Sequence, residues 1–154
     1  MLQQRLGDSF SQKERDSFLK RNLVPGAVCR IDVALDDAPT PKLAILAATE
    51  PEPIFLLINS NLCWLVENSP QRRQCQLPIL RREYPFLKRD SWIDCSVTFR
   101  LRSEELWSRI VGDLGSFLGE LNPSTCKSVL QKVGSSKMLS KRDKRAIESG
   151  LVGR

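Results

Sequence analysis

The sequence predicts an α+β fold, in which a small barrel or strongly bent sheet precedes a helical C-terminal part. Two observations indicate this fold. Short apolar or alternating runs separated by proline-rich loops fill residues 23–101, and apolar residues recur at helical spacing after Ser103. The 154 residues correspond to about one domain with a small appendage. We therefore expect a helical leader at 1–22, a barrel at 23–101 and a helical extension at 102–154.

A short helix is expected near the N-terminus, over residues 12–21. Ser11 and Glu14 have the spacing of a capping box, in which each side chain accepts a hydrogen bond from the other residue's backbone N–H. Phe18 and Leu19 supply a weak apolar edge. A docked helix and a solvated leader fit this pattern equally well.

The first strand is expected over residues 27–33, directly after the Pro25-Gly26 turn. Its residues alternate, with Val28, Arg30 and Asp32 on one face, as in a half-buried strand. The apolar run 43–48 indicates a central strand buried on both faces, although its period also allows a helix. Residues 54–58 indicate a second buried strand.

The middle of the chain mixes strands with proline-containing loops. Residues 74–80 alternate, and Pro78 places them at a sheet edge or strand end. A last strand is expected from Trp92 to about Leu101. The sequence of residues 62–66 fits either a strand or a helical turn. Loops are expected at two places, residues 36–41 and 70–73.

Three helices are expected in the C-terminal part. Ser103 can cap the first, and its apolar positions recur at helical spacing up to Phe117, before Asn122-Pro123 ends it. The second is expected at residues 124–133. Ser140 can cap a third, strongly basic helix. Its cations are Lys141, Arg142, Lys144 and Arg145.

The charge and the apolar content limit the compartment and the partner. The formal charge is +6, which suits an anionic partner or serves solubility alone. No apolar run approaches the length of a membrane span, and the N-terminus lacks the apolar core of a signal peptide. We expect a cytoplasmic protein that does not bind a membrane.

The reactive side chains limit the chemistry further. The five cysteines form no Cys-x-x-Cys pair, so we expect reduced, structural thiols and no zinc site. There is no histidine, which excludes histidine-based triads, histidine-ligated metals and a two-histidine ribonuclease mechanism. Catalysis would have to use carboxylates, Lys, Arg, Ser, Thr, Cys or Tyr. We expect neither a metal nor a cofactor.

A basic segment of about twenty residues is the strongest binding signal. Only Glu83 and Asp90 oppose its cations. If the loops between strands gather at one rim, these cations beside Tyr84 and Trp92 would follow phosphates and stack bases. An ordinary solvated surface is the alternative. The candidate RNA-binding residues are Arg72, Arg73, Arg81, Arg82, Lys88, Arg89 and Trp92.

Several stretches together resemble a known family. They are Val24-Pro25-Gly26, residues 41–46, residues 54–60 and residues 84–96. This pattern resembles the divergent, PemK/MazF-like members of the plasmid-maintenance toxin superfamily, over about residues 23–100. The resemblance implies an SH3-like barrel, often dimeric. It also implies metal-independent cleavage of single-stranded RNA and control by an antitoxin protein.

The resemblance also implies where a catalytic site would lie. The family's arginine at the start of the second strand corresponds to Lys42, and its threonine near the end of the next strand corresponds to Asn59 or Ser60. Cleavage through the 2′-hydroxyl of RNA needs a base, a stabiliser of the phosphorane charge and an acid. Lys42 would be the electrostatic clamp, and Ser60 or Asn59 would donate a hydrogen bond. Asp90 or Asp94 would be the base if burial raised its pKa.

Less specific interpretations of these residues remain. Lys42 also suits a solvated strand end, Asn59 and Ser60 suit a turn, and Trp92 suits the core. We therefore keep three functions open. The first is a toxin-like endoribonuclease. The second is a non-catalytic nucleic-acid or protein-binding module on the same barrel, and the third is a structural partner in a larger assembly.

Overall fold

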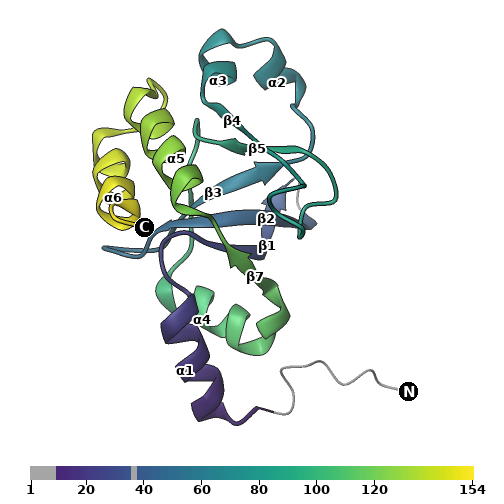
Figure 1. The fold of residues 1–154 in the computed structure, drawn as a ribbon, viewed down its shortest axis with the longest axis vertical. Coiled ribbons are helices and arrows are strands. Elements are labelled where there is room, and N and C mark those ends of the chain that lie inside the picture. The colour runs from purple at the N-terminus through teal and green to yellow at the C-terminus, as the bar shows by residue number, and fades with distance from the viewer. Residues whose placement is uncertain (1–9, 36–37) are drawn as a thin grey trace.

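The computed structural model describes residues 10–35 and 38–154 and confirms the α+β class. One antiparallel sheet curls into a half-barrel, with the strand order β4-β5-β3-β2-β1-β7 and with β6 paired to β3 (Figure 1). The strands are β1 (Ala27–Leu35), β2 (Ala38–Ala48), β3 (Ile54–Asn59), β4 (Gln76–Ile79), β5 (Ser91–Asp94), β6 (Phe99–Arg100) and β7 (Phe117–Glu120). The helices are α1 (Gln12–Asn22), α2 (Trp64–Glu67), α3 (Pro70–Gln74), α4 (Ser103–Gly112), the 3-10 turn η2 (Leu114–Ser116), α5 (Pro123–Ser135) and α6 (Lys141–Leu151).

The central strands bury both faces, as their apolar sequence predicts. Along β2, Ala44 and Leu46 belong to one core and Ile45 to the other, because successive side chains of a strand point to opposite faces. Phe55 and Leu56 divide in the same way along β3. The strand expected over residues 43–48 is thus confirmed, and the helical alternative is wrong.

Helices cover the two faces of the sheet, and each face has its own core. On one face α5 and α6 contribute Val129, Ile147 and Leu151 to the larger core. On the other face α1 and α4, which contact each other, contribute Leu19 and Leu106 (Figure 1). The burial of Leu19 shows that α1 is docked.

Side-chain caps mark where several helices begin. Those at Ser11 and Ser140 confirm the sequence patterns, whereas Asn122 was expected to end a helix. Ser11 accepts a hydrogen bond from the N–H of Glu14 at 3.2 Å, and Glu14 accepts one from the N–H of Ser11 at 2.7 Å. Asn122 and Ser140 cap α5 and α6 through Thr125 and Asp143. The first nine residues of the expected leader lie outside the described part of the chain.

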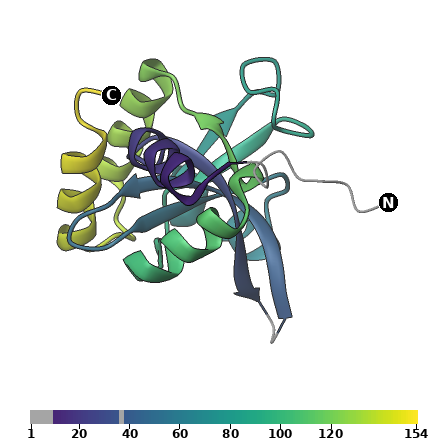
Figure 2. The ribbon, with the colours of Figure 1, turned by 90° about the horizontal axis from the view of Figure 1, so that it is seen from below.

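Two expectations about β-structure were wrong. The chain from Ala38 to Pro41 is not a loop but the start of β2, which pairs with β1 in a ribbon that extends beyond the rest of the sheet (Figure 2). Pairing with β3 begins only at Leu43, so the prolines lie on a free edge where a missing N–H breaks no ladder. The helix expected up to Asn122 ends at Gly112, and β7 then pairs with β1.

The middle of the chain also differs in detail. The expected loop at 70–73 is α3, because Pro70 suits the first helical position and Ser69 caps the helix. Residues 62–66, whose sequence fits either a strand or a helical turn, contain the start of α2. The expected last strand is split into β5 and β6, because the Asp94 carboxylate accepts a hydrogen bond from the N–H of Ser96 and turns the chain. No helix in the described ranges has both the length and the apolar character needed to cross a membrane.

The helices on the larger core cover only one end of their sheet face. Helix α6 packs against β2 so closely that a Cβ on Gly150 would overlap the carbonyl oxygen of Ala47. At the opposite end of the β2–β3 pair, Leu43 faces Ile58. A loop, residues 80–90, takes the place of a helix there, and this leaves space for a cleft.

Candidate functional site

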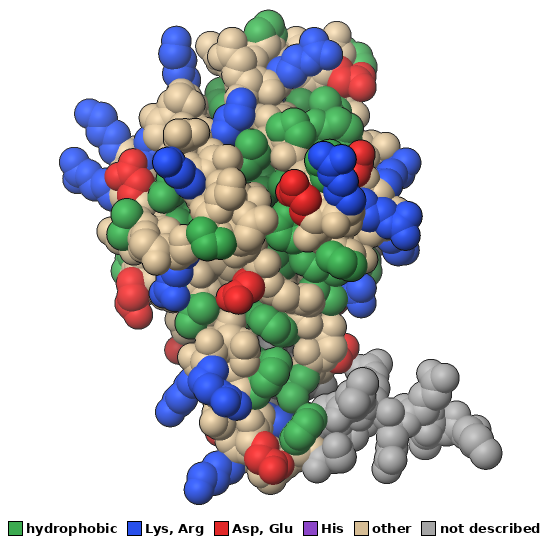
Figure 3. Space-filling view, in the orientation of Figure 1, with side chains coloured by type: hydrophobic (Ala, Val, Ile, Leu, Met, Phe, Trp, Pro, Cys, Tyr) green, Lys and Arg blue, Asp and Glu red, His purple; other side chains and the backbone are tan. Residues whose placement is uncertain are grey.

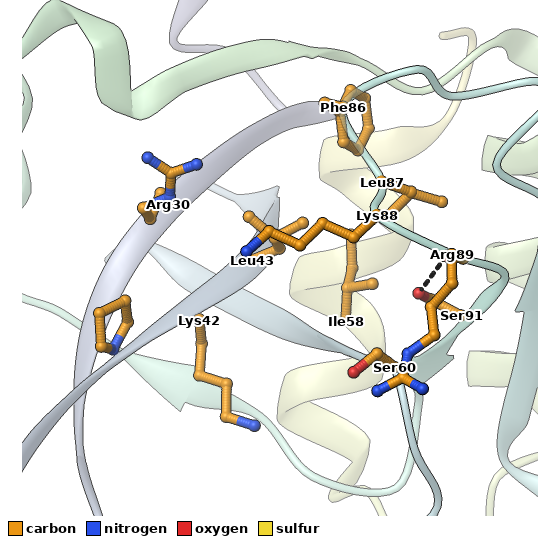
Figure 4. Close-up of a pocket in the computed structure, with 11 residues that line it drawn as sticks. Arg30, Lys42, Leu43, Ile58, Ser60, Phe86, Leu87, Lys88, Arg89 and Ser91 are labelled. Atoms are coloured by element: carbon orange, nitrogen blue, oxygen red, sulfur yellow. Dashed lines mark hydrogen bonds between the residues drawn. The ribbon is translucent and has the colours of Figure 1, made fainter.

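A cleft with a volume of about 530 Å³ lies at the end of the sheet face that α5 and α6 leave free (Figure 4). Three parts of the chain line it: the strands β1 and β2, the end of β3, and the loop that leads into β5. We call it the basic cleft. Its lining residues are Arg30, Pro41, Lys42, Leu43, Ile58, Ser60, Phe86, Leu87, Lys88, Arg89 and Ser91.

The strand register builds the floor of the cleft. Arg30 lies opposite Leu43, and Leu43 lies opposite Ile58, so these three side chains form a row across β1, β2 and β3. Residues directly opposite in antiparallel strands point to the same face. The floor is therefore apolar in the middle, with a guanidinium group at its β1 end.

The loop over the cleft is anchored to α5 by a buried tyrosine. The Tyr84 hydroxyl donates to Thr125 Oγ1 at 2.6 Å and accepts from the Asn122 N–H at 3.2 Å. The rings of Tyr84 and Phe86 pack with centroids 5.6 Å apart, and Leu87 is buried. These contacts hold the loop in place. Lys88 and Arg89, which follow on the same loop, therefore have a defined position beside the sheet.

Four cations come from three separate segments to line the basic cleft. They are Arg30 on β1, Lys42 on β2, and Lys88 and Arg89 on the loop. The hydroxyl groups of Ser60 and Ser91 lie among them, and none of the described lining residues is acidic. Charges of one sign lining a cleft add to a local field that concentrates ligands of the opposite sign. The basic cleft is therefore suited to an anion with hydrogen-bond acceptors.

Hydrogen bonds orient the groups at one end of the cleft. In the amide orientation that satisfies both of its polar atoms, Asn61 accepts from Arg89 Nη2 at 3.0 Å and donates to the Ser60 carbonyl at 3.1 Å. Ser91 is buried, and its hydroxyl donates to the Arg89 carbonyl at 2.8 Å (Figure 4). Arg89 is thus tied to the segment that carries Ser60.

The structure brings two of the four candidate catalytic residues together. Lys42 and Ser60 both line the basic cleft. Asn59 pairs with Trp92 on β5 and is absent from the described lining. Asp90 is exposed, and its carboxylate accepts a hydrogen bond from the Arg81 N–H at 2.9 Å. Asp94 is buried, but its carboxylate accepts hydrogen bonds from Gln76 on β4 and from the N–H of Ser96 just after β5.

The candidate RNA-binding residues are divided between the cleft and other surfaces. Lys88 and Arg89 line the cleft. Trp92 is half-buried and lies between Asn59 and Pro78 on the neighbouring strands. Lysine and arginine side chains project from separate places on the face shown in Figure 3. The remaining candidates lie on α3 and on the turn after β4: Arg72, Arg73, Arg81 and Arg82.

Sequence reasoning missed Arg30 and Ser91 as cleft residues. Arg30 shares a strand face with Val28 and Asp32, and this alternation does not show what lies opposite Arg30. The register of the β1–β2 pair determines that the neighbour of Arg30 on β2 is Leu43. Ser91 belongs to an Asp-Ser pair that fits a simple turn equally well.

Four of the five cysteines are buried, and Cys63 is exposed. Burial raises the pKa of the Cys29 and Cys95 thiols to about 12, and for Cys95 the nearby Asp94 adds to the rise. Burial also raises the pKa of Cys126. Such thiols remain protonated at neutral pH and are poor nucleophiles. Within the described ranges, no three His, Cys, Asp or Glu side chains gather as a metal site requires.

No protein-family model matches the sequence, and no curated protein matches it. The functional argument therefore depends on the geometry of the basic cleft and on the residues that line it.

Proposed function

We propose that the protein binds single-stranded RNA, with the phosphate backbone in the basic cleft. The observation that carries this proposal is the convergence of four cations and the exposed Ser60 hydroxyl on one cleft whose described lining has no carboxylate. Phosphate contacts from Lys and Arg supply most of the affinity for nucleic acids, and hydroxyl groups add hydrogen bonds to phosphate oxygens.

The floor of the cleft favours a single strand over a duplex. Leu43, Ile58 and Phe86 offer apolar surface between the cations. Unpaired bases can contact such surface, whereas paired bases are stacked within the helix. Ser60 is exposed at the cleft, where its hydroxyl can bond the 2′-hydroxyl that distinguishes RNA from DNA.

Metal-independent cleavage of the bound RNA is a second candidate, favoured by the shared position of Lys42 and Ser60. In this reaction the 2′-oxygen attacks phosphorus, the bond to the 5′-oxygen breaks, and the products are a 2′,3′-cyclic phosphate and a 5′-hydroxyl. The cleft cations would stabilise the phosphorane charge, and Lys42 would protonate the leaving oxygen. The 2′-proton needs an acceptor, and Asp90 would have to turn from Arg81 to supply it.

The second candidate agrees with the PemK/MazF-like resemblance. In that case the curled sheet is an SH3-like barrel, the protein is a toxin of a toxin–antitoxin system, and an antitoxin silences it. A homodimer would fit the same family. The curled antiparallel sheet supports this interpretation of the fold, and the absence of a carboxylate from the described cleft lining favours binding over cleavage.

One experiment tests both candidates. The purified protein is incubated in EDTA with end-labelled single-stranded RNA, and binding and cleavage are measured on the same samples. We expect the logarithm of the association constant to fall linearly with the logarithm of the salt concentration. The slope should be about −3, because each neutralised phosphate of a single strand contributes about −0.7 and the cleft has four cations. Cleavage in EDTA, lost in Lys42→Ala and Ser60→Ala, would establish the nuclease.

The matched control is Lys127→Ala, which removes an exposed lysine on α5, away from the cleft lining. It should leave the affinity and the salt slope nearly unchanged. Asp90→Asn separates the two candidates, because it should abolish cleavage and leave binding intact. If wild-type protein fails to bind single-stranded RNA at low salt, or if Lys127→Ala weakens binding as much as Lys42→Ala, the proposal is wrong.

A further inference from the structure

The first residue of α2 exposes a large aromatic ring. The side chain of Trp64 is 70% exposed and that of its neighbour Leu65 is 54% exposed, whereas Val66 supplies the buried contact of this short helix. Tryptophan is highly buried on average in folded proteins. The ring of Trp64 therefore contributes little to the core, and its exposure suggests a ligand.

This ring lies close to the basic cleft along the chain. Ser60 lines the cleft, and four residues span at most about 14 Å, so Trp64 lies within that distance of Ser60. Between them, Asn61 bonds Arg89 of the cleft. Figure 1 shows α2 beyond the end of β3, on the side of the sheet where the β4–β5 loop lies.

The surroundings of Trp64 favour an anionic ligand that carries a flat ring. Helix α3 packs beside α2 and carries Arg72 and Arg73. Helix α2 carries one acid, Glu67. An aromatic face beside cations is how proteins bind single strands without reading base edges: the ring stacks a base, and the cations follow the phosphates.

We propose that Trp64 is a stacking platform for one nucleobase of a single strand whose phosphates lie in the basic cleft. This inference rests on the proposed function, because the strand must first occupy the cleft. The strand leaves the cleft past Ser60, follows the segment that contains Asn61, and places a base on the indole. Arg72 and Arg73 then contact the phosphates beyond that base. Every base has a π-face, so this subsite tolerates any sequence.

The test combines abasic nucleotides with Trp64 variants in full-length protein. A set of single-stranded RNA oligonucleotides carries one abasic residue at each position in turn, and affinity is measured by fluorescence anisotropy. We expect one position at which loss of the base weakens binding to wild-type protein about tenfold. Trp64→Leu should weaken binding of the intact strand about tenfold, and the abasic penalty at that position should disappear.

Two variants control for the aromatic ring. Trp64→Phe keeps a π-face and should retain most of the affinity. Leu65→Ala removes a neighbouring exposed apolar side chain without a π-face and should leave the affinity unchanged. Both side chains are exposed, so the variants should melt at the temperature of the wild type, which is checked directly.

The outcomes separate this inference from the proposed function. If wild-type protein binds RNA and Lys42→Ala weakens binding, but the abasic penalty is unchanged in Trp64→Leu or occurs at no position, stacking is wrong and the proposed function stands. If Trp64→Leu and Leu65→Ala weaken binding equally, the surface is a general apolar contact and stacking is wrong. If wild-type protein binds no single strand, both proposals are wrong.

Discussion

The two ends of one sheet face are built from the same strands but do different things. At one end, α6 packs on β2 at Ala47, and the surrounding side chains are apolar and buried. At the other end Arg30 and Ser60 border an open cleft, over an apolar floor at Leu43 and Ile58. The covered end stabilises the fold, whereas the open end has groups available for a ligand.

The difference shows how a small domain can separate stability from binding. Stability comes from apolar area removed from water, which the covered end supplies. The proposed binding would use charged groups that folding leaves near water, which the open end supplies. Variants at the two ends should therefore have separate effects, and each prediction below tests that separation.

The largest expected effect is on RNA binding, in the double variant Lys42→Ala/Arg89→Ala. A charge-assisted hydrogen bond contributes about 1.5–3 kcal/mol, so losing two should weaken binding by two to four orders of magnitude. The salt slope should become shallower by about 1.4, since two phosphate contacts are lost. Because both side chains lie at the open end, the free energy of unfolding should stay within about 0.5 kcal/mol of wild type.

The control for this variant is Arg81→Ala/Arg82→Ala, which removes two exposed cations of the basic segment that lie outside the described cleft lining. It should weaken binding far less than the cleft variant. Equal losses from the two pairs would show that total charge, and not the cleft, determines the affinity.

The second effect is on stability at alkaline pH, through the buried thiols. The pKa of Cys29 and of Cys95 is raised by burial from 9.0 to about 12, so the folded protein holds these protons more tightly than the unfolded chain. Their contribution is complete below pH 9 and is lost as pH rises towards 12. Within that window the free energy of unfolding should fall by about 1.4 kcal/mol per pH unit for each thiol.

Urea unfolding at several pH values measures this slope, and Cys29→Ala/Cys95→Ala should make it shallower while lowering stability at pH 7. Both thiols are buried, that of Cys95 in the larger core and that of Cys29 in the other. The described cleft lining contains no cysteine. A stability that is level between pH 9 and pH 11 would contradict the assigned burial of the thiols.

The third effect belongs to the covered end alone. Gly150→Ala places a methyl group against the carbonyl oxygen of Ala47, so α6 must move away from β2. Overpacking of this kind costs about 1–3 kcal/mol in the free energy of unfolding. RNA affinity, measured below the melting temperature, should stay close to that of wild type. Gly134→Ala is the control, since a Cβ there meets no atom within 4 Å.

The sequence predicted local structure well where the signal is local. The capping residues Ser11 and Ser140 mark where α1 and α6 begin. It failed at β7, because Phe117 continues the helical spacing of α4 although Gly112 ends the helix. The free edge of β1 at Ala27–Cys29 then accepts residues 117–120 as a strand, and that pairing is a tertiary effect.

The candidate site shows the same limit. Lys42 and Ser60 could be proposed as a pair through the family resemblance, and both line the cleft. Arg30 could not, because it reaches the cleft through the register that places it opposite Leu43. Where the cations of the basic segment lie on the surface depends on the directions of α3 and of the turn after β4. Composition does not determine these directions.

The smallest expected effect tests the connection between the two ends. Tyr84 links the cleft loop to α5, because its hydroxyl bonds both Thr125 and the Asn122 N–H. Tyr84→Phe removes both bonds and should lower the free energy of unfolding by about 1–2 kcal/mol. It should also weaken RNA binding a few-fold, since Lys88 and Arg89 follow on the same loop. Thr125→Val provides the comparison, because it removes one of the bonds from the α5 side and keeps the tyrosine. If Tyr84→Phe lowers stability while RNA affinity stays at the wild-type value, the loop does not depend on this anchor, and the two ends of the sheet face are independent in this respect as well.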